Sequence, residues 1–165
     1  MPMKYAENTE VSADKSLAEI KQTLTRYGAT KFAFFEEEER AAIGFEVKGR
    51  RVRFIVPLPS RTAEDIVYWY PGNGKTKAPR PIEKQHERWE KSCRQRWRAL
   101  ALAVKAKLEV VESGISTFEE EFLAYVVLPD GQTVGEFLRP QIETSYQTGK
   151  MPPLLPGIGE TGGIN

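Results

Sequence analysis

The chain has 165 residues, of which 40% are hydrophobic and 28% are charged, with a formal net charge of +1. This length and composition fit one globular domain with its own core, and they argue against a disordered chain. One cysteine and one histidine, Cys93 and His86, give little material for a disulfide, a Cys-rich zinc site or a Ser-His-Asp triad. Because no apolar run approaches the roughly 20 residues that span a bilayer and no signal peptide is visible, we expect a cytoplasmic protein with no membrane partner. The sequence gives no reason to expect a small-molecule cofactor.

Charge is distributed unevenly along the chain. Residues 1–74 hold 11 basic and 11 acidic side chains, and residues 75–98 hold nine basic and three acidic ones, a net charge of +6. Residues 99–165 hold four basic and nine acidic side chains, a net charge of −5. This asymmetry predicts either an anionic partner or contact between the cationic and anionic segments.

The chain is expected to open with a flexible segment and a helix. Residues 1–11 are polar and should be poorly ordered. The helix should begin at Ser12, a suitable N-cap, and end before Gly28, because apolar residues between them recur on one stripe.

Residues 31–58 then change to a period of two, which is typical of strands. The alternation predicts a three-stranded antiparallel meander, with a two-residue turn at Gly49-Arg50 between its second and third strands. In that register Glu46 lies opposite Arg53 on the outer face.

The rest of the chain is mainly helical. A long helix is expected from Pro81 to Gly114, where apolar residues recur every three or four positions. Two shorter helices should follow, one capped by Ser116 and one starting after Thr133, the second bent or divided at Pro140.

These elements predict an α+β fold in which an N-terminal helix precedes the meander, the long helix packs on the sheet, and two shorter helices end the domain. The expected division is a flexible N-terminus over residues 1–11, one domain over residues 12–148 and an extended Pro/Gly-rich tail over residues 149–165.

Residues 68–80 read YWYPGNGKTKAPR and join an aromatic triplet to a basic loop. Aromatic rings can stack on nucleic-acid bases, and each such stack is worth about 1–3 kcal/mol. Because side chains alternate along a strand, at most two of the three rings can face one ligand.

A basic sheet face beside a basic helix predicts a groove for single-stranded nucleic acid, with no catalytic residue and no metal. The expected phosphate contacts are Arg50, Arg51, Arg53, Lys75, Lys77, Arg80, Arg94 and Arg98, and the expected stacking rings are Tyr68, Trp69 and Tyr70.

An alternative interpretation starts from Glu46-Val47-Lys48. An acidic-x-Lys triplet on a strand is the pattern that PD-(D/E)xK nucleases use to bind Mg²⁺ and activate water. Such a site also needs an upstream acidic residue, and the candidates are Glu36–Glu39, in a predicted turn.

The second half of the chain is distinctive from CRQRWRALALAV to GEFLRPQI, residues 93–142, with VRFIVPLPS upstream and MPPLLPG downstream. These segments resemble a family of small uncharacterised proteins encoded by phages and prophages. The resemblance covers most of the chain from Arg51 to Gly157 and implies a bacterial host cell, but no activity. The element order alone is similar to the RecT/Redβ type of single-strand annealing protein, which is also common in phages.

The sequence therefore predicts a non-enzymatic nucleic-acid-binding protein of phage DNA metabolism that binds or anneals single-stranded DNA. The main alternative is a phage interaction protein that binds and modulates a host protein, and the nuclease is a third hypothesis. The sequence does not distinguish DNA from RNA as the ligand, although single-stranded DNA is favoured. It also leaves open whether the protein forms a homo-oligomer.

Overall fold

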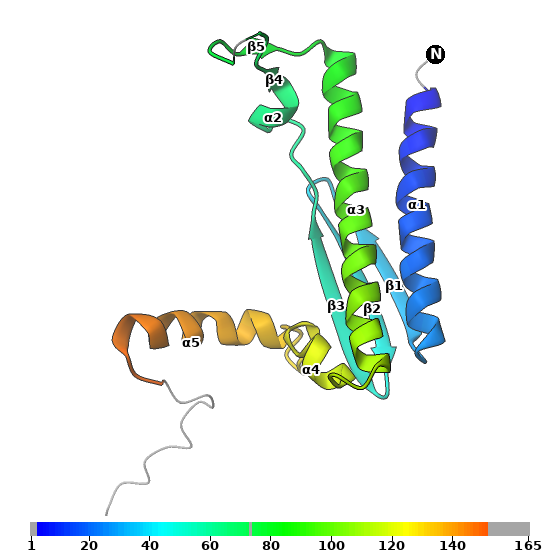
Figure 1. Cartoon of the computed structure of the whole chain (residues 1–165), viewed down its shortest axis with the longest axis vertical. Helices are drawn as coiled ribbons and strands as arrows, with labels where there is room; N and C mark the ends of the chain where they lie inside the picture. The colour runs from blue at the N-terminus through cyan, green and yellow to red at the C-terminus, as the bar shows by residue number, and fades with distance from the viewer. Residues whose placement is uncertain (1–2, 73, 152–165) are drawn as a thin grey trace, which may run out of the picture.

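The computed structural model describes residues 3–72 and 74–151. In chain order the elements are α1 (Met3–Arg26), β1 (Thr30–Glu36), β2 (Arg40–Val47), β3 (Arg50–Pro57), α2 (Glu64–Val67), β4 (Tyr68–Trp69), β5 (Ala78–Pro79), α3 (Ile82–Glu112), α4 (Phe118–Phe122), the 3-10 turn η1 (Leu123–Tyr125) and α5 (Val134–Thr148) (Figure 1). The predicted α+β fold is confirmed. None of the described helices is long and apolar enough to cross a membrane.

The antiparallel sheet has the order β1-β2-β3, but its hairpin turn differs from the predicted one. The chain turns at Lys48-Gly49, whose φ angles of 49° and 74° fit a type I′ turn, and not at Gly49-Arg50. Glu46 consequently lies opposite Arg51 instead of Arg53. The register has shifted by two residues, so each side chain keeps its predicted face.

Helices α1 and α3 cover one face of the sheet. The core joins alternate residues of β2 and β3 to the apolar stripes of both helices, so the predicted packing of the long helix on the sheet is confirmed. The innermost residues are Ile20 and Leu24 of α1, Phe45 of β2, Val52 of β3, and Trp97, Val104 and Leu108 of α3.

The two long helices run side by side in the same direction (Figure 1). The Arg98 guanidinium of α3 pairs with Glu19 of α1 at 2.8 Å. At the far end the Tyr27 hydroxyl donates to Glu112 over 2.5 Å, and this bond raises the pKa of Tyr27 to about 12. Helix α1 starts at Met3 and not at Ser12, so the polar residues ahead of the predicted cap are helical as well.

The segment after α3 is capped one residue later than predicted. Thr117, not Ser116, forms a capping box with Glu120. The Thr117 hydroxyl accepts from the Glu120 amide, and the Glu120 carboxylate accepts from the Thr117 amide. The helix that was expected to follow Ser116 is short: α4 ends at Phe122 and passes into the 3-10 turn η1. Val126, directly after η1, pairs with Val52 at the edge of β3.

The last helix, α5, projects from the body (Figure 1). Its predicted cap, Thr133, is confirmed and forms a capping box with Glu136. Pro140 lies inside the helix without dividing it. The helix ends at Gly149, and the predicted tail lies outside the described residues from 152 onward. The division of the chain at residues 11 and 148 stays a prediction.

Candidate nucleic-acid interface

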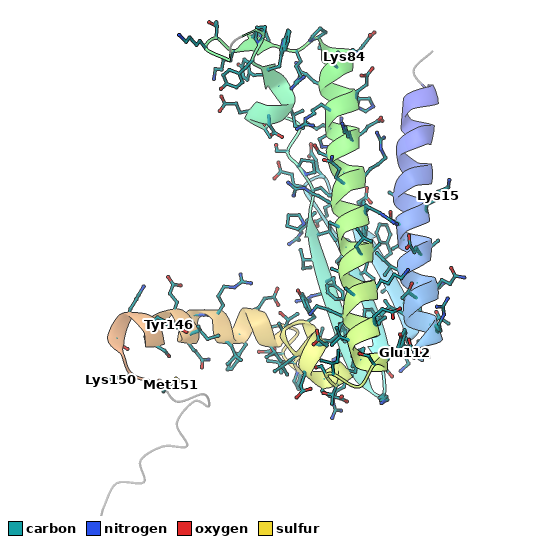
Figure 2. The ribbon with its side chains drawn as sticks, in the orientation of Figure 1. Lys15, Lys84, Glu112, Tyr146, Lys150 and Met151 are labelled. Atoms are coloured by element: carbon teal, nitrogen blue, oxygen red, sulfur yellow. The ribbon has the colours of Figure 1, made fainter. Side chains whose placement is uncertain are left out.

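The predicted contact residues do not form one groove, because most of them lie at opposite ends of α3. Figure 2 labels Lys84 near the start of this helix and Glu112 at its end. The β2–β3 turn lies beside the end of α3, and residues 68–80 lie beside its start (Figure 1). A helix of this length spans about 45 Å, so one short ligand cannot reach both places.

Two of the three arginines of β3, Arg51 and Arg53, also face away from α3. Val52 and Phe54 of this strand point into the core, so Arg51 and Arg53 occupy the opposite face of the sheet. Arg53 pairs with Glu136 of α5 at 2.8 Å, whereas Arg50 and Arg51 are exposed. The predicted groove between a basic sheet face and the long helix is therefore wrong.

Residues 64–72 and 74–80 form a small lobe at the start of α3, which we call the aromatic–basic lobe. In it β4 pairs with β5, so the stretch contains a short antiparallel ladder. The Arg80 amide donates to the Val67 carbonyl at 2.7 Å, and its Nε donates to the Tyr68 carbonyl at 3.1 Å. These bonds hold the two ends of the loop together.

Two of the three aromatic rings in the lobe are open to solvent. Trp69 is 43% exposed and Tyr70 is 55% exposed. Tyr68 is half-buried, and the Lys77 ammonium lies 4.6 Å from the centre of its ring. The two exposed rings are neighbours in the sequence, because Tyr70 lies beyond the end of the short strand β4. How many of the three rings can face one ligand stays a prediction.

Trp69 opens into a hollow of about 360 Å³ against the first turns of α3, which we call the aromatic–basic pocket. Its lining residues are Trp69, Arg80, Pro81, Lys84, Glu87, Arg88 and Lys91. Of these, only Trp69 and Arg80 were among the predicted contacts. The signal for the other cations was the spacing of Lys84, Arg88 and Lys91, which puts the three on one helical stripe.

The cations of the pocket are only partly neutralised by the protein itself. Lys84 pairs with Glu87 at 2.8 Å, and Arg88 lies 3.9 Å from Asp65. The Arg88 Nε is buried without a hydrogen-bond partner among the described residues. Lys91 is exposed, and in the described ranges no carboxylate pairs with it. The pocket thus retains donors for an anionic ligand.

Other predicted phosphate contacts are engaged within the chain. Lys77 pairs with Glu64 at 3.2 Å, and this carboxylate raises the pKa of the lysine. Arg98 pairs with Glu19, and Arg94 lies 3.9 Å from the buried Glu90. Lys75 is exposed at the tip of the lobe.

The first half of α3 is fixed to the segment after β3 by polar and ring contacts. The Trp89 indole donates to the Pro59 carbonyl at 2.7 Å, and the Arg61 guanidinium lies 3.8 Å from the centre of the Trp89 ring. Arg61 also contacts His86 of α3, with 3.3 Å between its guanidinium nitrogen and the His86 Nδ1. These contacts set the position of the helix on which the pocket is built.

The residues of the nuclease hypothesis are not brought together. Glu46 pairs with Lys31 at 2.9 Å, and Lys48 lies in the hairpin turn instead of on the strand. The upstream acids, Glu36–Glu39, lie at the other end of β2 from Glu46. Within residues 3–72 and 74–151 no group of three His, Cys, Asp or Glu side chains could hold a metal ion.

No family model, curated protein or solved structure matches this chain. The resemblance to phage-encoded proteins and the similarity in element order to RecT/Redβ therefore stay predictions, as do the bacterial host and the cytoplasmic location. Any function must be inferred from the geometry of the pocket.

Proposed function

We propose that the protein binds single-stranded nucleic acid, with DNA as the favoured form, through the aromatic–basic pocket. The observation that supports this most directly is an exposed indole, Trp69, beside four cations around one open hollow. An exposed ring accepts an unpaired base by stacking, and nearby cations neutralise the phosphates that flank it. A base within a duplex would have to leave its stack before it could reach the ring.

The spacing of the cations suits a strand that runs along α3. Lys84 and Arg88 are separated by four residues and Arg88 and Lys91 by three, which correspond to about 4.5–6 Å along a helix axis. Successive phosphates of a flexible single strand can follow such a row. In this arrangement Arg88 and Lys91 meet phosphates while a base stacks on Trp69.

The acidic residues near the pocket favour a ligand with several phosphates. A single phosphate has to compete with Glu87 for Lys84 and with Asp65 for Arg88. An oligonucleotide offers several phosphates at once and releases several counterions, so its affinity falls steeply with salt. We therefore expect an oligonucleotide to bind much more tightly than a mononucleotide.

The test is fluorescence anisotropy with a labelled single strand of about 16 nucleotides, titrated at salt concentrations from about 50 to 200 mM. Lys91→Gln should weaken binding and reduce the slope of log K against log salt by about one. The matched control is Arg50→Gln, which removes an exposed cation at the hairpin end of the molecule. This variant should bind like the wild type.

Two results would overturn the proposal. One is no binding at about 50 mM salt, where phosphate contacts are strong. The other is an equal loss in Lys91→Gln and Arg50→Gln, which would place binding elsewhere or make it a property of net charge. If the wild-type protein retains a host protein in a pull-down but no oligonucleotide, the interaction hypothesis replaces this one.

A further inference from the structure

The helix α5 exposes an apolar ridge that nothing in the described part of the chain covers. The ridge consists of Ile142 and Tyr146, which lie four residues apart and therefore share one face, in line with the half-buried Leu138 one turn earlier. Ile142 is 53% exposed and Tyr146 is 89% exposed, and no residue of α5 is buried. Figure 2 labels Tyr146 on this helix, well away from the sheet.

The outer face of the sheet carries an apolar hollow, on the side opposite to α1 and α3. We call it the sheet hollow, and its volume is about 340 Å³. Ala42 and Gly44 of β2 form its floor together with Ala33 of β1, and their small size is what leaves the space. Phe35, at its edge, is 54% exposed.

The helix α5 is anchored so that it leads away from its own sheet hollow. Thr133 pairs with Val127 in an isolated bridge, and Glu136 pairs with Arg53 at 2.8 Å. Gly135 approaches Ala124 so closely that an added Cβ would lie 2.9 Å from the Ala124 carbonyl oxygen. These contacts fix the first turn, and the remaining turns extend outward from the β3 edge (Figure 1).

We propose that α5 of one copy lies in the sheet hollow of a second copy of this chain. The ridge of Ile142 and Tyr146 would fill the hollow over Ala42 and Gly44, since a surface with small side chains allows a helix to approach closely. Each copy brings one ridge and one hollow, so self-association covers both apolar surfaces without a further protein.

Polar groups on the two surfaces are complementary as well. Arg51 is exposed at the rim of the hollow, and no acidic partner for it occurs among the described residues. The Nε of Arg53, which also lines the hollow, is buried without a hydrogen-bond partner in the described ranges. Glu143 on α5 is exposed and likewise has no cationic partner there. A carboxylate on the incoming helix matches the guanidinium groups that border the hollow.

This contact is between unlike surfaces, so a mixing experiment tests it sharply. Ile142→Glu disables the ridge and Ala42→Lys fills the hollow, and each variant alone should be monomeric by light scattering at concentrations where the wild type associates. A mixture of the two should form complexes of two chains, since one intact ridge can still meet one intact hollow. Thr144→Glu, on the opposite side of α5, is the control and should associate like the wild type.

The proposal is overturned if the wild type stays monomeric, if Ala42→Lys still associates, or if the mixed variants form no complex. Circular dichroism checks that each variant is folded. If either variant is unfolded, a disulfide test replaces it: a chain carrying Ala42→Cys and a chain carrying Ile142→Cys should cross-link to each other. Cross-linking no faster than that of Thr144→Cys with Ala42→Cys also overturns the contact.

The aromatic–basic pocket contributes to neither surface, so this inference does not depend on the proposed nucleic-acid binding. Self-association measured without nucleic acid therefore tests the contact alone. An Ala42→Lys variant that is monomeric but still binds an oligonucleotide would separate the two proposals.

Discussion

The two ends of α3 have different physical characters. At its C-terminal half Trp97, Val104 and Leu108 are almost fully buried and belong to the main core. At its N-terminal end the lobe is held by backbone hydrogen bonds, ion pairs and one deeply buried apolar residue, Ile66, which lies outside that core. The same helix thus stabilises the fold at one end and presents cations at the other.

This difference explains where a binding surface can form. At the lobe an exposed ring and four cations border one open hollow, whereas near the hairpin Arg53 is paired with Glu136 of α5. A region held by few buried contacts also opens locally at lower free energy than the core. We expect the lobe to adjust to a ligand while the sheet end stays fixed.

The largest expected effect is that of Trp97→Ala. This ring is 2% exposed and contacts the Phe34 ring with centroids 5.8 Å apart, so its removal leaves a cavity in the core. We expect a loss of about 3–5 kcal/mol in the free energy of unfolding, measured by urea denaturation followed by circular dichroism. Leu102→Ala, a half-exposed position on the same helix, is the control and should change little.

Ile66→Ala tests the stability of the aromatic–basic lobe, at the N-terminal end of α3. Because Ile66 lies outside the main core, its truncation should increase amide hydrogen exchange in residues 64–80 more than in β2 and β3. If exchange in the sheet rises equally, the lobe and the core unfold as one unit, and the contrast between the two ends does not hold.

The thiol of Cys93 lies between these two ends and reports on the packing there. Burial raises its pKa from 9.0 to about 11, so at mildly alkaline pH the thiolate is scarce. Since each pKa unit is a tenfold change in ionisation, we expect alkylation by iodoacetamide to be about a hundredfold slower than for an exposed thiol. Rapid reaction of the folded protein would show that this part of α3 opens easily.

Local patterns in the sequence predicted the fold well, because they depend on short-range rules. The Thr133 cap, the alternation of the strands and the stripe of α3 all follow from periodicity and capping chemistry. The hairpin turn was misplaced because Lys48 adopts a positive φ, which is uncommon for a lysine and which the pattern does not signal.

The site was harder to predict, because it depends on how elements are placed in space. Arg51 and Arg53 were assigned to the same groove as Arg80, and only the packing of α3 on the opposite face of the sheet separates them. Lys91 was visible in the basic stripe of the helix. Its proximity to Trp69 requires the β4–β5 pairing, which two-residue strands do not reveal in a sequence.

Trp69→Ala should separate binding from stability at the lobe. The ring is 43% exposed, so its loss should change the free energy of unfolding by less than about 0.5 kcal/mol. Binding of a single strand should weaken by about 1–3 kcal/mol, which is roughly five- to more than a hundredfold, with the salt slope unchanged. Anisotropy titrations measure this, and Trp69→Phe, which keeps a stacking surface, should restore most of the affinity.

The smallest expected effect concerns the anchor of α5 at the sheet end. Thr133→Ala removes the hydroxyl that accepts from the Glu136 amide, at a cost of about 1 kcal/mol. The Thr133 amide donates to the Glu136 carboxylate and, with Arg53, lowers the pKa of that carboxyl below its usual 4.5. A lowered pKa in the folded state means that the contribution of Glu136 is fully present above the usual value of 4.5 and is lost as the pH falls through the folded-state value.

Urea denaturation at neutral pH and near pH 3 should therefore show that Glu136→Gln costs more stability at neutral pH than in acid. The control Thr144→Ala, inside the same helix, should cost less than about 0.5 kcal/mol at either pH. An equal cost of Glu136→Gln at both pH values would mean that charge on this carboxylate does not hold α5. The direction in which the helix projects would then depend on the close packing of Gly135 against Ala124 instead.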